Sequence, residues 1–122
     1  MSVSGDSPPA VAAAERGTAH WVAAVRRQRL ATPDHGDFYA LAGEAVSTLR
    51  ALHDLALVLR AQIESYSEGR QLYDDTRGAV APAERLTVAT DALGMFMHAL
   101  DMADRFGNEF WSAIGHIGVV ED

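Results

Sequence analysis

The amino-acid sequence predicts an all-α fold, an antiparallel helical bundle of three long helices followed by a short C-terminal helix. Apolar side chains recur at alternating steps of three and four residues within 37–69 and within 82–106, which is the spacing of one face of an α-helix. Residues that start or stop helices lie at the ends of these stretches. Asn-Gly and Asp-Gly turns and alternating β-branched runs are absent, so the sequence indicates no strand.

The first helix is predicted over residues 8–31. Ser7 supplies a hydroxyl cap, and Pro8 has the fixed φ angle that suits the first helical position. Gly17 costs about 1 kcal/mol relative to alanine inside a helix, so a start at Thr18 is the alternative. The Thr-Pro pair that follows ends the helix, because proline disfavours the α conformation in the residue before it.

The second helix is the longest stretch of helical periodicity. Asp37 is the favoured N-cap, with Asp34 as the alternative, and the helix is expected to run to Glu68. Gly69 is then a natural left-handed stop. The predicted apolar stripe consists of Leu49, Leu52, Ala56, Leu59, Ile63 and Tyr66.

The third helix is predicted from Pro82 to Phe106, with Gly107 closing it. Its stripe repeats the same steps through Leu86, Ala89, Leu93, Phe96, Leu100 and Ala103. Asn108 can then cap a short fourth helix, whose apolar side would hold Phe110, Trp111, Ile114 and Ile117.

The second and third helices each contain a run of apolar residues that point to every side. Residues 55–59 and 92–97 therefore leave no wet face at those levels, and a small bundle needs something else to cover them. We expect a homodimer that completes the bundle between subunits. The predicted interface residues are Leu55, Leu57, Val58, Leu59, Met95, Phe96, Met97 and Trp111. The alternative is a monomer with the second helix at its centre and an ordinary exposed Leu57 or Val58.

Length and composition favour one domain without catalytic chemistry. The 122 residues are predicted to form a single domain over 8–122 behind a disordered tail over 1–7. There is no cysteine for thiol or metal chemistry and no lysine for a Schiff base. A nucleophile elbow, a phosphate loop and metal motifs are also absent, so no enzyme activity, catalytic residue, metal site or cofactor is predicted.

The acidic charge bounds the partners. A formal net charge of -7 disfavours a general affinity for nucleic acid or anionic membranes, which leaves proteins or small molecules. Arg26, Arg27 and Arg29 suit the negative end of the first helix without any ligand. No apolar run is long enough for a membrane span, and the first residues do not resemble a secretory signal, so a cytoplasmic location is expected.

Two polar motifs are candidates for a metal or catalytic site. His98, Asp101 and Asp104 follow each other at steps of three and could present an imidazole and two carboxylates to a divalent metal or form a proton-transfer pair. The pair His53 and Asp54 resembles the His-Asp pair of metal-dependent phosphohydrolases, but the other ligands would have to come from elsewhere in the fold. A solvated polar face explains the first motif better, and a histidine at the border of the apolar face explains the second.

Two further features keep an alternative function open. Met95, Met97 and Met102 lie together in the third helix, where thioethers fill a core or line a ligand pocket. The second hypothesis is therefore a small-molecule-binding or sensor bundle with a pocket of methionine and aromatic residues. The connection at 69–81 is long for a helical bundle, and it either tucks over the bundle end or forms a recognition loop.

Overall fold

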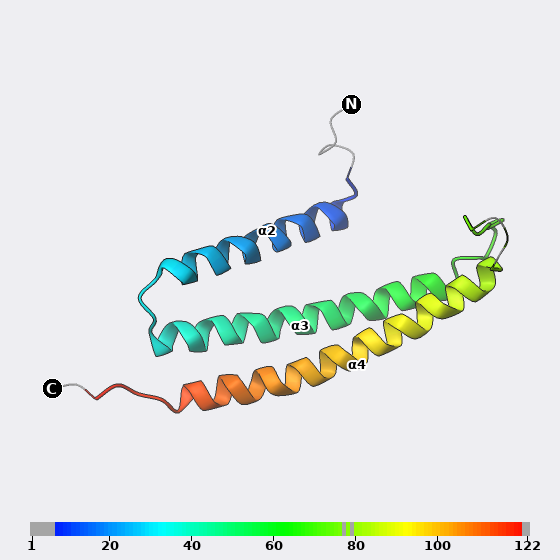
Figure 1. The fold of residues 1–122 in the computed structure, drawn as a ribbon. Coiled ribbons are helices and arrows are strands. Elements are labelled where there is room, and N and C mark those ends of the chain that lie inside the picture. The colour runs from blue at the N-terminus through cyan, green and yellow to red at the C-terminus, as the bar shows by residue number, and fades with distance from the viewer. Residues whose placement is uncertain (1–6, 77, 79, 121–122) are drawn as a thin grey trace. The chain divides into compact units, whose positions relative to one another are not determined.

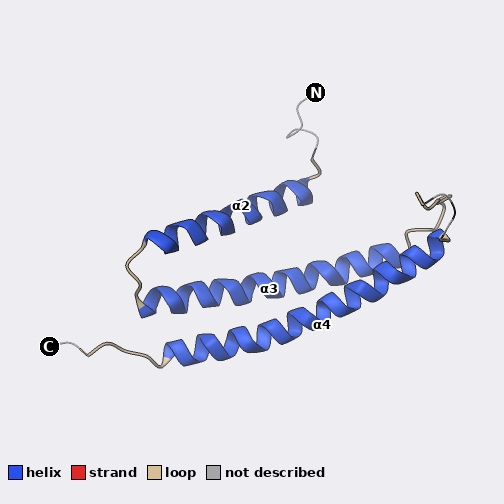
Figure 2. Cartoon of the chain, in the orientation of Figure 1, coloured by secondary structure: helices blue, strands red, loops and turns tan. Residues whose placement is uncertain are grey.

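The computed structural model describes residues 7–76, 78 and 80–120, and its regular structure is helical (Figure 1). The helices are α2 (Pro9–Leu30), α3 (His35–Glu64) and α4 (Pro82–Gly115). No strand occurs among the described residues, as the colouring by secondary structure shows (Figure 2). The predicted all-α class with three long helices is confirmed.

The chain divides into two compact units, residues 1–34 and residues 35–122. The first unit contains α2, and the second contains α3, α4 and the segment that joins them. The predicted single domain over 8–122 stays a prediction. The predicted disordered tail lies, except for Ser7, outside the described residues.

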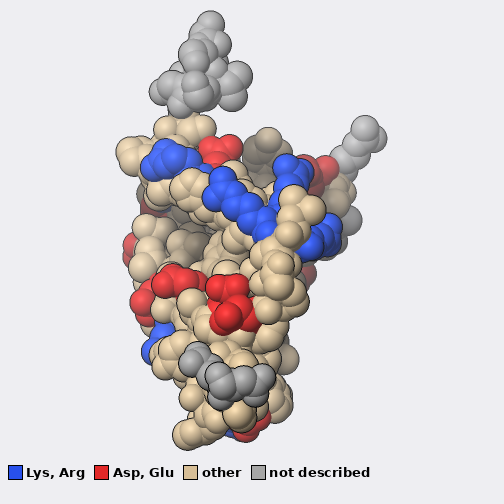
Figure 3. Space-filling model, turned by 90° about the vertical axis from the view of Figure 1, so that its left-hand side faces the viewer, with Lys and Arg blue, Asp and Glu red and all other residues tan. Residues whose placement is uncertain are grey.

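Helix α2 is a basic helix. It begins at Pro9 and continues through Gly17, so the alternative start at Thr18 does not occur. Arg27 and Arg29 occupy its last turn, where the negative end of the helix dipole favours cations. With four arginines and one glutamate α2 has a net charge of +3, and its basic side chains are prominent in the space-filling view (Figure 3). Residues 35–122 carry six arginines and 14 acidic residues, a net charge of -8.

Helices α3 and α4 lie side by side and run in opposite directions (Figure 1). At 1.5 Å per residue, the 30 residues of α3 span about 45 Å and the 34 residues of α4 about 51 Å. Pro82 takes the first turn of α4, as predicted. Helix α3 ends at Glu64, earlier than predicted, and turns lead from it to Gly69, whose φ of 69° is left-handed as expected.

The predicted short fourth helix is not a separate element, because residues 108–115 continue α4. Gly107 does not end a helix but lies at a close contact between α3 and α4. A Cβ atom on it would be 2.9 Å from Cγ2 of Val46, which is closer than carbon atoms pack. Asn108 donates from Nδ2 to the backbone oxygen of Asp104 at 2.8 Å, inside the helix, and caps nothing.

A seam of mainly small and apolar residues, interrupted by a few polar ones, joins the two helices. Its most buried members are Ala42, Val46, Ala56 and Leu100. Steps of three and four average 3.5 residues, which keeps one line of contact between two helices that coil around each other. The seam positions are Ala42, Val46, Leu49, His53, Ala56, Arg60 and Ile63 in α3, and Leu86, Thr90, Leu93, Met97, Leu100, Asp104, Gly107, Trp111 and Ile114 in α4.

The predicted apolar stripes share only half of their members with this seam. Each helix has an apolar column in the seam and a second apolar column beside it. The predicted stripe of each helix combines residues of both columns. The residues Leu49, Ala56, Ile63, Leu86, Leu93 and Leu100 lie in the seam, whereas Leu52, Leu59, Tyr66 and Phe96 are exposed. The apolar surface of each helix is therefore wider than one helical neighbour can cover.

Replacing Gly107 with alanine is expected to lower the free energy of unfolding by about 1–2 kcal/mol, because the new methyl group meets Val46, which is only 2% exposed. The same change at Gly94, where nothing lies within 4 Å of an added Cβ, should raise it by up to about 1 kcal/mol through helix propensity. Urea denaturation followed by circular dichroism measures both. Equal stabilisation by the two substitutions would contradict the close approach.

Candidate interaction surface

The seam divides the outer surface of the α3–α4 hairpin into two flanks. With Val46 and Met97 at heptad position a, the seam holds positions a and d, and positions e and g lie on either side of it. Reversing one helix reverses its flanks, so in an antiparallel pair the e positions of both helices share one side. The contacts agree, since Arg50 at e reaches Asp104 and Asp101 at e reaches His53. Positions e and b form the polar flank, and positions g and c form the apolar flank.

An arginine–carboxylate ion pair and a histidine–carboxylate contact bridge the two helices on the polar flank. Nε of Arg50 donates to Oδ1 of Asp104 at 3.0 Å, and Nε2 of His53 lies 3.3 Å from Oδ1 of Asp101. Nδ2 of Asn108 also donates to Oδ2 of Asp104 at 3.2 Å. A surface cavity of about 330 Å³ lies beside these contacts. It is lined by Arg50, His53, Asp101 and Asp104 together with Leu49, Asp54 and Leu100. Asp101 and Asp104 therefore each have a partner on the facing helix, and Asp104 has a further partner on its own helix.

The two predicted polar motifs therefore meet in one cluster. Asp101 and Asp104 turn toward α3, where His53 and Arg50 pair with them, whereas His98 is exposed. Asp54 lines the cavity without joining either pair. Among the described residues, no group of three or more His, Asp or Glu side chains is placed to hold a metal ion. The sequence signal for these pairs is a polar residue at a seam position, His53 in α3 and Asp104 in α4.

The polar pairs should contribute much less to stability than the seam. Arg50→Ala is expected to lower the free energy of unfolding by less than about 1 kcal/mol, because the Arg50 side chain is 61% exposed and solvent screens the pair. Leu100→Ala should cost about 2–5 kcal/mol, since Leu100 is only 7% exposed and leaves a cavity. Chemical denaturation of both variants measures the contrast. A larger loss for Arg50→Ala would contradict the assigned seam.

The apolar flank carries no charged residue over most of its length. Fourteen of its sixteen residues between 38 and 62 and between 89 and 113 are apolar, and only Thr48 and Gln62 are polar. All the charges of these two segments therefore lie at other positions. The flank consists of Phe38, Leu41, Ala45, Thr48, Leu52, Leu55, Leu59 and Gln62 of α3, and Ala89, Ala92, Phe96, Ala99, Ala103, Phe106, Phe110 and Ala113 of α4.

The register of the hairpin places the members of the flank level with one another. Contacts between Arg50 and Asp104 and between Gly43 and Trp111 show that each step forward in α3 matches one step back in α4. By this register, and to within one residue, Leu59 is level with Phe96, Leu52 with Ala103 and Leu55 with Ala99. Six large residues of the flank are exposed, namely Leu52, Leu55, Leu59, Phe96, Phe106 and Phe110.

The predicted interface residues fall into four groups. Leu55, Leu59 and Phe96 belong to the apolar flank, and Val58 and Met95 lie at position f on the outer sides of their helices. Leu57 lies on the polar flank and is 47% exposed, the same fraction as Leu55. Met97 and Trp111 are half-buried seam residues.

Trp111 has a role within the hairpin. Its indole ring packs against the backbone of Gly43, where an added Cβ would lie 3.4 Å from the ring, and its ring centre is 5.4 Å from that of Tyr39. Its buried Nε1 has no hydrogen-bond partner. An apolar packing role for the indole is consistent with both observations.

The methionines of α4 do not converge on one cavity. Met95 and Met102 are exposed, while Met97 is half-buried at the seam. The cavity over Arg50 and His53 and the cavity of about 500 Å³ described below have no methionine or aromatic lining, whereas a cavity of about 360 Å³ beside the connecting segment is lined by Tyr66 and Tyr73 but by no methionine. The pocket of the second hypothesis therefore has no counterpart in these three cavities.

The segment between α3 and α4 is anchored by Asp74. Its Oδ1 accepts from Nε of Arg85 in α4 at 2.8 Å, and its Oδ2 accepts from the backbone N–H of Thr76 at 3.0 Å and from the Thr76 hydroxyl. The hydrogen bond from Arg85 holds the pKa of Asp74 below its ordinary value, and the bond from Thr76 acts in the same direction. Of the apolar pair, Leu72 is half-buried and Tyr73 is exposed.

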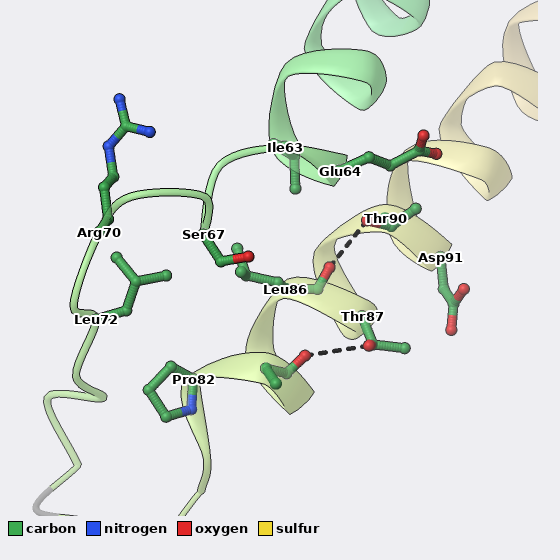
Figure 4. Close-up of a pocket in the computed structure, with 11 residues that line it drawn as sticks. Ile63, Glu64, Ser67, Arg70, Leu72, Pro82, Leu86, Thr87, Thr90 and Asp91 are labelled. Atoms are coloured by element: carbon green, nitrogen blue, oxygen red, sulfur yellow. Dashed lines mark hydrogen bonds between the residues drawn. The ribbon is translucent and has the colours of Figure 1, made fainter.

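A second cavity of about 500 Å³ lies between the end of α3 and the start of α4 (Figure 4). The hydroxyls of Thr87 and Thr90 donate to backbone oxygens one turn earlier in α4. Arg70 extends away from α4, donates to the backbone oxygen of Tyr66 at 2.9 Å and lies 4.4 Å from the centre of its ring. Thr87, Thr90 and Arg70 are thus engaged locally, and Arg70 points away from the other two.

Asp74→Asn is expected to loosen the connecting segment, because the amide loses the charge-assisted bond to Arg85. Cleavage by chymotrypsin after Tyr73, which is 86% exposed, should become several-fold faster at neutral pH. Asp75→Asn changes the neighbouring exposed carboxylate and serves as the control. Equal cleavage rates for the two variants would contradict the anchor.

The anchor also predicts a pH dependence. Because the pKa of Asp74 is lowered from 3.8 in the folded chain, its stabilisation is complete above that value and is lost as the pH falls through the lowered pKa. The difference in thermal midpoint between the wild-type protein and Asp74→Asn should therefore shrink below about pH 4. A difference that is constant between pH 7 and pH 2 would exclude this linkage.

No protein family, curated protein or solved structure matches the chain. Among the described residues, no helix combines the length and apolar character of a membrane span. Any function must therefore be argued from the two flanks and the seam.

Proposed function

We propose that the protein is a non-enzymatic helical assembly protein that works as a homodimer through the apolar flank of α3 and α4. The observation that supports this proposal is a surface of sixteen residues from two helices that carries no charge and leaves six of its large side chains exposed. Contiguous apolar surface of this kind is rare on monomers and typical of protein contact sites.

The energetics favour association of this flank. Full burial of a leucine or phenylalanine side chain stabilises by about 1.5–3 kcal/mol, and the flank offers several from each copy. Most of that gain offsets the loss of translational and side-chain freedom on binding, so a dimer of moderate affinity is expected. The antiparallel bundle that the sequence predicts would then be completed by helices of two chains.

The partner is expected to be a second copy of this chain, with a further protein partner as an extension. Nucleic acid is not proposed, because residues 35–122 carry a net charge of -8 and would repel phosphates. A cytoplasmic location is part of the proposal, since the chain has no cysteine to form disulfides in an oxidising compartment.

Leu55→Glu is expected to weaken the dimer, because it places a carboxylate inside the apolar contact in both copies. The dissociation constant should rise at least about tenfold, a change of about 1.4 kcal/mol. Leu57→Glu is the matched control, since the same residue type with the same 47% exposure lies on the polar flank. Light scattering after size exclusion, over a concentration series, measures the mass of each variant.

A wild-type mass of 13.1 kDa at tens of micromolar would overturn the proposed function. Equal weakening by Leu55→Glu and Leu57→Glu would move the contact away from the apolar flank. Circular dichroism establishes that both variants keep their helices, so that a change in mass reports on association.

A further inference from the structure

The two halves of the apolar flank differ in the size of their side chains. On α3 the flank is formed mainly by Phe and Leu, and on α4 it is formed by five alanines and three phenylalanines. The leucines Leu52 and Leu55 are level with alanines of α4, and Leu59 is level with Phe96. The flank is therefore a raised row beside a lower row with three bulky points.

Unequal rows restrict how a second copy can pack. If α3 faced α3 of the second copy, leucine would meet leucine, while α4 facing α4 would leave gaps between alanines. Both outcomes are costly, because overpacking strains side chains and gaps forfeit dispersion contacts. Placing α3 of each copy against α4 of the other sets Leu52 and Leu55 against alanines on both sides, as well-packed cores alternate large and small residues, while Leu59 meets Phe96.

We propose that two copies form a four-helix bundle in which α3 of each copy packs against α4 of the other, around a two-fold axis parallel to the helices. This arrangement rests on the proposed homodimer and specifies its geometry. The contact is the same patch on both copies, as a two-fold axis requires. Every helix then has two antiparallel neighbours, which also suits the helix dipoles.

The remaining features of the hairpin agree with this geometry. The polar flanks turn outward, so the ion pairs of Arg50 and His53 stay in water and the acidic residues of the two copies remain at the periphery. Sixteen residues from each copy approach the 20–30 per side of a typical stable interface.

The axis direction also fixes which residues meet. Rotation about an axis parallel to the helices changes no heights, so residues that are level within one chain are level between the two. Gln62 of one copy should therefore lie beside Ala92 of the other, both at position c and both exposed in the single chain. An axis perpendicular to the helices would invert the heights of the second copy and bring α3 against α3.

Cysteine cross-linking tests this pairing in a chain that has no cysteine of its own. Full-length Gln62→Cys and Ala92→Cys proteins are mixed, allowed to exchange subunits and mildly oxidised, so that any disulfide between them joins two chains. The mixed disulfide, identified by mass spectrometry, should dominate over either homodimeric disulfide. Ala61→Cys mixed with Ala92→Cys is the control, because Ala61 lies on the polar flank and should form no such bond.

The outcomes separate the geometry from the dimer itself. Each variant is first shown by light scattering to keep the wild-type mass, and Leu55→Cys with Ala99→Cys provides a second level pair. If the protein is dimeric but neither mixture gives the mixed disulfide, or if Gln62→Cys links mainly to itself, the proposed geometry is wrong while the dimer stands. If the wild-type protein is monomeric, both proposals fail.

Discussion

A pair of α-helices can bury one stripe of each helix, and α3 and α4 carry apolar side chains on two. The first pair of columns forms the seam, with Val46 and Leu100 among its most buried members. The second pair forms the apolar flank, which keeps Leu55 and Phe96 in contact with water. Because adjacent columns on a helix are about 50° apart, no rotation of the helices hides both. The proposed dimer rests on this surplus column.

The seam depends on small residues that let the helices come together. Ala42 and Ala56 are buried, and Gly107 leaves room for Val46. The short distance between the two helices brings side chains on the polar flank within reach of one another, so that Arg50 pairs with the carboxylate of Asp104 on the facing helix. Ion pairs of this kind add little stability, but they oppose a sliding of one helix along the other, since a shift would separate the charges.

Periodicity predicted the helical class, the three long helices and the start of α4, because proline and the repeat of apolar residues act locally. The predicted end of this helix at Gly107 was wrong, because a glycine at this place in the sequence is typical of a helix stop, whereas α4 continues to Gly115. The role of Gly107 is set by Val46, which is far away in the chain and near only after folding. Local signals cannot report such a contact.

The surface was harder to predict than the helices. A stripe predicted from one helix alone combines seam residues with flank residues. Leu49 and Leu52 therefore belong to the same predicted stripe, although only Leu49 faces α4. The absence of charge at two heptad positions of both helices was available in the sequence, but assigning those positions to one side requires the antiparallel register. The ion pairs of His53 and Arg50 depend on the same register.

The two tryptophans give this chain a built-in optical reporter for each of its units. Trp21 lies in α2, and Trp111 packs in the hairpin seam beside Tyr39. With Trp21 replaced by phenylalanine, the remaining indole emission would report on the hairpin alone, and excitation of Tyr39 could transfer to it over 5.4 Å. With Trp111 replaced instead, the same signal would follow the basic helix. Order in the two units can thus be monitored separately, without an added dye.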